Sequence, residues 1–179
     1  RQWRPHFVVS TLGTNDAKDG VWDRQAFVKD YADTCVEFLE RMAPKPVIFL
    51  LVPPPVYEDG AYEIQQDVVR EELPAAVRDV AVEAARRLNE PLQAAAKRAR
   101  QEVPAEVLAK TCVIDYFADR GAEARRRCYF AEDGVHPNEL GTRLLASVVF
   151  ADLRKEVARS LRRMADAASM AANDDPLGW

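Results

Sequence analysis

Three short apolar runs alternate with longer segments whose apolar residues recur at helical spacing. The runs cover residues 7–12, 47–52 and 112–117, and the first two are rich in apolar and β-branched residues. A strand covered on both faces has this composition, because neither of its faces needs to be polar. The pattern therefore predicts three strands.

The segments that follow these runs predict helices. The first helix begins near Asp23, whose side chain suits an N-cap. The second covers residues 67–101, where Pro74 and Pro91 are each expected to force a new start or a kink. The third follows Pro137 and carries a long apolar stripe.

Strands that alternate with helices predict an α/β fold, with a parallel sheet between two helical layers. The chain has 179 residues, 48% of them apolar, which fits one domain with a single core. We expect this domain to cover residues 1–165. Residues 166–179 are small and polar, which predicts a disordered tail.

Charge and composition narrow the range of partners. The net charge is −4, with no cluster of basic residues such as nucleic-acid binding requires, so no nucleic-acid partner is expected. No apolar run approaches the roughly 20 residues of a membrane span. Three widely spaced cysteines match no zinc or redox motif. The sequence leaves the localisation unknown.

Two polar motifs follow predicted strands. Gly13-Thr14-Asn15-Asp16 comes after the first strand, and Asp133-Gly134-Val135-His136 comes after the third. The carboxyl ends of parallel strands lie on one edge of a sheet, where such folds place their working sites. Both motifs are therefore expected in one candidate site.

The second motif can form a general base. Asp133 lies three residues before His136, so its carboxylate can fold back onto one imidazole nitrogen and leave the other free to take a proton. Pro137 keeps His136 out of the helical conformation. The alternative is an Asp-Gly turn before a helix cap, with His136 merely exposed.

The first motif can stabilise negative charge that develops on a reaction intermediate. Gly13 permits a sharp turn, after which the Asn15 amide can donate to a developing oxyanion. Asp16 is expected to hold the turn through backbone N–H groups. The alternative is an ordinary turn or cap built from Asn and Asp, which is common.

A metal site is not expected, and no cofactor is implied. The two histidines are His6, before the first strand, and His136, after the third. A strand of six residues is about 20 Å long, so the two rings should lie at opposite ends of the sheet.

The segments "LGTNDAK" and "DGVHPN" resemble, in that order, the third and fifth conserved blocks of SGNH/GDSL-type hydrolases. The nearest likeness is to sialate O-acetylesterase-like and other carbohydrate esterases, over residues 3–157. The resemblance implies a flavodoxin-like three-layer α/β/α fold. It implies that Asn15 is the oxyanion donor, that Asp133 orients His136, and that His136 is the base.

The chain departs from this family in one respect. The resemblance implies a nucleophilic serine in a Gly-Asp-Ser motif and a glycine donor from a second block, and neither has a counterpart here. We therefore expect that the first two strands of the family fold lie upstream and that this chain alone is inactive. The exposed edge of the first visible strand would then favour self-association.

The predicted function is a serine esterase that removes a small acyl group, such as acetate, from a carbohydrate. One alternative is a non-catalytic pseudo-hydrolase that binds carbohydrate, and another is a hydrolase of lipids or thioesters. An upstream Gly-Asp-Ser motif would separate the enzyme from the pseudo-hydrolase.

Overall fold

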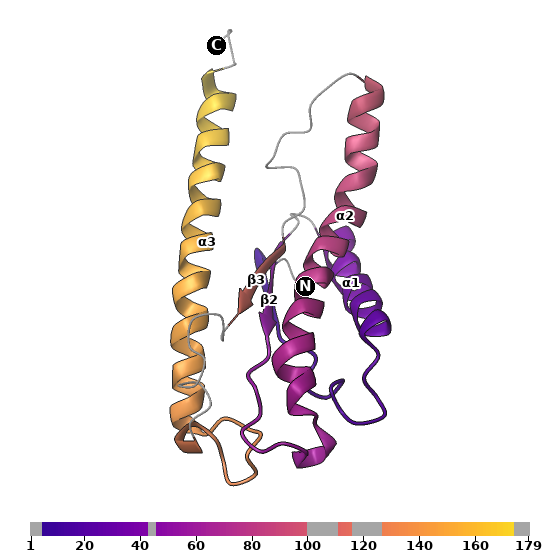
Figure 1. Cartoon of the computed structure of the whole chain (residues 1–179). Coiled ribbons are helices and arrows are strands. Elements are labelled where there is room, and N and C mark those ends of the chain that lie inside the picture. Colours follow the sequence, from indigo (N-terminus) through magenta and orange to yellow (C-terminus); the bar gives the residue numbers. More distant parts are fainter. Residues whose placement is uncertain (1–4, 43–45, 100–110, 116–126, 174–179) are drawn as a thin grey trace.

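A parallel sheet stands between helices in the computed structural model, which describes residues 5–42, 46–99, 111–115 and 127–173 (Figure 1). Its strands are β1 (Phe7–Ser10), β2 (Val47–Val52) and β3 (Thr111–Asp115), in the order β1-β2-β3. Both pairings are parallel. The predicted α/β class is confirmed.

Two helices cover one face of this sheet. They are α1 (Arg24–Arg41) and α2 (Leu73–Ala99), which pack against each other (Figure 1). Asp23 caps α1 as predicted, because its carboxylate accepts hydrogen bonds from the backbone N–H groups of Gln25 and Ala26.

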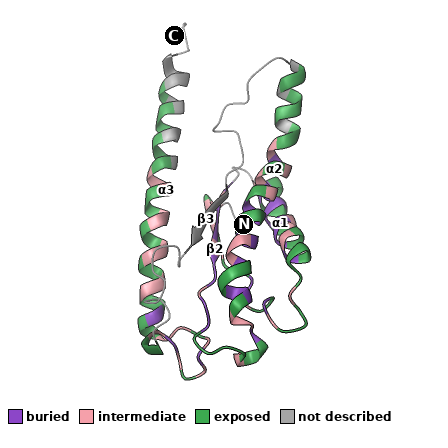
Figure 2. Ribbon diagram, in the orientation of Figure 1, coloured by how far each residue is buried: buried purple, intermediate pink, exposed green. Residues whose placement is uncertain are grey.

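The main core lies between β2 and these two helices. Buried residues are concentrated there, whereas α3 is mostly exposed or half-buried (Figure 2). Ile48, Leu50 and Val52 alternate along β2 and belong to this core. Phe49 is also buried but lies outside that cluster, with its ring 6.1 Å from the ring of Phe7.

The last helix, α3 (Glu139–Asn173), lies on the opposite side of the sheet from α1 and α2 (Figure 1). It continues past the predicted boundary at residue 165, so the expected disordered tail is helical as far as Asn173. Residues 166–173 are rich in alanine, the best helix former, and this favours propagation of the helix. The remainder of that predicted tail lies outside the described residues.

Two short helical segments lie between β2 and α2. They are the 3₁₀-helix η1 (Ala61–Glu63) and the π-helical turn η2 (Val68–Glu72), which leads directly into α2. Pro74 directly follows this π-helical turn, one residue into α2, so the helical stretch changes from π to α geometry there. Pro91 lies inside α2 without dividing it, so no new helix starts at Pro91. The alternative expectation for Pro91, a kink, stays a prediction.

The strand ends differ slightly from prediction. β2 matches residues 47–52, whereas β1 ends at Ser10 because the chain then turns toward Gly13. β3 ends at Asp115, and the last two predicted positions lie outside the described residues. Within the described ranges, no helix combines the length and apolar character needed to cross a membrane.

Candidate functional site

The second motif forms a carboxylate–histidine pair. Asp133 Oδ2 lies 2.7 Å from His136 Nδ1, and the His136 side chain is 70% exposed. A donor proton on Nδ1 leaves the lone pair on Nε2, the nitrogen turned away from the carboxylate. The arrangement is therefore that of an oriented general base.

Three donors keep Asp133 ionised. The backbone N–H of Val135, the His136 imidazole and the backbone N–H of His136 lower the pKa of Asp133 to about 2. The two backbone groups both donate to Oδ1, each at 2.9 Å, and this leaves Oδ2 for the imidazole. The turn thus keeps Asp133 ionised and directs its Oδ2 toward the His136 imidazole.

Backbone and cap contacts fix the position of this turn. Gly134 has a φ of +71°, and a Cβ on it would lie 2.8 Å from Glu58 Cβ. Asn138 donates to the carbonyls of Cys128 and Phe130, and its Oδ1 accepts from the N–H of Gly141 in the first turn of α3. His136 therefore lies two residues before Asn138, which tethers the start of α3.

The first motif makes a tight turn after β1. Gly13 is buried with a φ of +124°, and the N–H of Ala17 donates to its carbonyl at 3.0 Å. Asn15 is exposed, so its amide is available to a ligand. The backbone hydrogen bond from Ala17 to Gly13 closes the turn. No hydrogen bond to the Asp16 carboxylate is found among the described residues. Asp16 thus does not hold the turn as predicted.

One segment contacts the second motif and the residues that directly follow the first motif. We call residues 57–66 the bridging loop. On one side Gln65 N–H donates to Ala17 O at 2.9 Å, and Asp19 N–H donates to Glu63 O at 2.8 Å. On the other side the N–H groups of Tyr57 and Glu58 both point to the carbonyl oxygen of Gly134, at 2.7 and 3.3 Å. The two predicted motifs are thus joined through a single loop.

The bridging loop also carries an aromatic ring to the histidine. The Tyr62 ring lies edge-on to the His136 imidazole, with centroids 6.1 Å apart and planes at 76°. Tyr62 and its neighbour Glu63 have φ values of 54° and 65°. Such left-handed conformations cost about 1–3 kcal/mol for a residue other than glycine.

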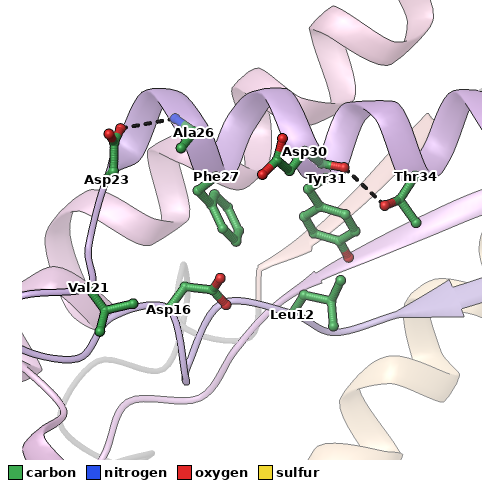
Figure 3. Close-up of a pocket in the computed structure, with 9 residues that line it drawn as sticks. All are labelled: Leu12, Asp16, Val21, Asp23, Ala26, Phe27, Asp30, Tyr31 and Thr34. Carbon is green, nitrogen blue, oxygen red and sulfur yellow. Dashed lines mark hydrogen bonds between the residues drawn. The ribbon is translucent and has the colours of Figure 1, made fainter.

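A cavity of about 330 Å³ lies between α1 and the chain that follows β1 (Figure 3). Leu12, Asp16, Phe27 and Tyr31 are among its lining residues, and Figure 3 shows the Asp16 carboxylate beside it. None of Asn15, Asp133 and His136 lines it. The Asp133–His136 pair instead faces open surface.

Two serines of the described ranges have structural partners. The Tyr31 hydroxyl donates to Ser10 Oγ at 2.8 Å, and Ser147 donates to a carbonyl in its own helix. Burial raises the pKa of Tyr31 to about 12, so this hydroxyl keeps its proton. Neither serine contacts His136. Among the described residues, no group of three or more metal-ligating side chains is found.

The fold is thus a parallel α/β fold, with the Asp133–His136 pair in the turn before α3. The family model of GDSL-like lipases and acylhydrolases matches residues 1–144. The chain therefore belongs to this family of ester hydrolases.

A solved structure has a similar fold. A GDSL-like lipase from Bacteroides thetaiotaomicron matches 85% of this chain with a TM-score of 0.51 and 17% sequence identity, which supports the fold. The match covers 63% of the length of that protein. No protein of curated function matches in sequence.

Sequence reasoning found the Asp133–His136 pair but missed Tyr62 and the bridging role of its loop. The links of this loop to the two turns are backbone hydrogen bonds, which leave no side-chain pattern. Two non-glycine residues in left-handed conformation leave no signal in the sequence either.

Proposed function

We propose that this chain supplies the base and one oxyanion donor of a serine esterase that releases a short acyl group, such as acetate, from a carbohydrate. His136 is the base, Asp133 orients it, and Asn15 is the donor. No serine of this chain follows Gly-Asp, so the proposal requires a nucleophile from sequence outside residues 1–179.

The chemistry proceeds in two balanced steps. The serine hydroxyl passes its proton to His136 Nε2 while its oxygen bonds to the acyl carbon, and the carbonyl oxygen becomes an oxyanion that accepts from Asn15. The bond to the alcohol oxygen then breaks, and that oxygen takes the proton from His136. Water repeats the sequence on the acyl-serine and releases the carboxylic acid.

One observation carries the proposal. The contact of 2.7 Å between Asp133 and His136 sets the tautomer, and the exposed imidazole leaves Nε2 open to a hydroxyl. The bridging loop supports it by tying the turn that holds Asn15 to the turn that holds His136.

The surroundings favour a polar alcohol over a lipid chain. Glu58, whose N–H points to the Gly134 carbonyl, and its neighbour Asp59 are exposed, and the imidazole is itself 70% exposed. An apolar chain would gain little here, because its binding energy comes from removing apolar surface from water. A sugar can instead hydrogen-bond to these groups.

The test uses the protein expressed from its complete reading frame. His136→Ala should lower kcat for acetate release by about 10³-fold or more, and Asn15→Ala by about 10²–10³-fold. His6→Ala is the matched control, because His6 precedes β1 at the other end of the sheet. Equal effects of the two histidine substitutions would contradict the proposal.

Two further outcomes select between the alternatives. Faster hydrolysis of long-chain acyl esters than of acetylated sugars would identify a lipid esterase. Absence of hydrolysis, together with binding of sugars, would identify a pseudo-hydrolase.

A further inference from the structure

Tyr62 is an exposed aromatic residue beside the candidate base. Its side chain belongs to no buried cluster, and the residue is 57% exposed. Its ring stands 6.1 Å from the His136 imidazole, measured between centroids. The ring thus lies beside the imidazole while much of its surface stays open.

The backbone holds this ring in a costly conformation. Tyr62 and Glu63 are both left-handed, although glycine would adopt that conformation more easily. Local hydrogen bonds fix it: Glu63 N–H donates to Gly60 O, and Ile64 N–H donates to Ala61 O. Ile64 is 2% exposed and anchors the segment in the core. Burial of the tyrosine does not account for the strain.

The position of the ring indicates which part of a substrate it meets. In the proposed mechanism His136 returns its proton to the oxygen of the departing alcohol, so that alcohol has to lie beside the imidazole. A group next to His136 on the exposed side therefore contacts the alcohol. A sugar ring has an apolar C–H face that can pack on an aromatic ring.

We propose that Tyr62 is a specificity-determining residue whose exposed ring packs against the sugar that carries the ester. This inference rests on the proposed function and adds the surface that recognises the leaving alcohol. The phenol hydroxyl is not required for the contact, whereas the ring is.

The kinetic test compares two acetyl esters that differ only in the alcohol: a mono-O-acetylated methyl hexopyranoside and ethyl acetate. In the protein from the complete reading frame, Tyr62→Ala should lower kcat/KM for the sugar ester about tenfold, mainly through KM. The value for ethyl acetate should change less than twofold. Tyr62→Phe should retain activity on both esters, and Phe150→Ala, an exposed aromatic on α3, is the control.

A second measurement does not need the nucleophile. Titration of the protein from the complete reading frame with the unacetylated methyl hexopyranoside should shift the NMR signal of the His136 ring, and Tyr62→Ala should reduce that shift. Equal losses on both esters, or a shift independent of Tyr62, would overturn the inference. If the protein hydrolyses neither ester, the proposed function fails, and the titration alone decides whether Tyr62 contacts sugar.

Discussion

Gly13→Ala tests how the turn that presents Asn15 is built. The glycine is buried with a φ of +124°, and a Cβ there would lie 2.5 Å from Leu73 Cδ1 and 2.9 Å from Cδ2. Leu73 is 0% exposed, so its side chain has no solvent into which it could swing. The substitution therefore meets a backbone penalty and a steric penalty together.

The two penalties can be estimated separately. The disfavoured φ costs about 1–3 kcal/mol, and overpacking of a buried site costs about 1–3 kcal/mol more. We expect Gly13→Ala to lower the free energy of unfolding by about 2–6 kcal/mol. Gly20→Ala is the matched control, because Gly20 has a φ of +69° and nothing within 4 Å of its Cβ position. It should cost only about 1–2 kcal/mol.

A double-mutant cycle isolates the steric part. Leu73→Ala alone should cost about 2–5 kcal/mol, because it empties a buried position. It also removes the atoms that the methyl group introduced by Gly13→Ala would meet. The double variant should therefore be more stable than the sum of the two losses predicts, by about 1 kcal/mol or more.

Urea denaturation followed by far-UV circular dichroism measures the free energy of unfolding of the unsubstituted protein and of the four variants. Equal losses for Gly13→Ala and Gly20→Ala would refute the reasoning, and so would strict additivity in the cycle. Either result would mean that the packing of Gly13 on Leu73 does not fix the turn.

Three other predictions concern a charge, a buried hydroxyl and a strand edge. The folded state lowers the pKa of Asp133 to about 2. The ionised carboxylate therefore stabilises the fold fully above the pKa of the unfolded chain, near 3.9, and this contribution is lost as the pH falls toward about 2. Asp133→Asn should accordingly lower the urea midpoint at pH 6 but not at pH 2. Tyr31→Phe should cost about 1 kcal/mol in urea denaturation by removing the bond to Ser10, and Ser10→Ala should add little in that background. Val9 is 47% exposed on the edge strand β1, where a second copy of the chain could pair. Val9→Lys should therefore shift the sedimentation profile toward monomer, whereas the control Val82→Lys on α2 should not. An unchanged profile for Val9→Lys would exclude this edge as the self-association surface.

Hydrophobic periodicity was sufficient to predict the α/β fold class from the sequence. A run such as residues 47–52 can bury both faces only within a covered sheet, and β2 occupies the predicted range. Asp23 was predictable as a cap because its carboxylate acts within its own turn. Asp133 and His136 were predictable for the same reason, since three residues of chain suffice to join them.

Longer-range features could not be predicted in this way. Pro91 suggested a new start or a kink, but α2 continues through it to Ala99. Aspartate is a common turn residue, which suggested a structural role for Asp16, yet the turn closes through a backbone hydrogen bond between Ala17 and Gly13. The bridging loop depends on carbonyl and N–H groups, which every residue carries.

The bridging loop makes the site a single cooperative unit. Local unfolding of this loop would release Ala17 on one side and Gly134 on the other, so the turn that carries Asn15 and the turn that carries His136 would lose order together. The amide hydrogens of Gln65 and Tyr57 should then show similar protection from exchange with solvent. A long insertion in the loop would thus disturb both turns at once.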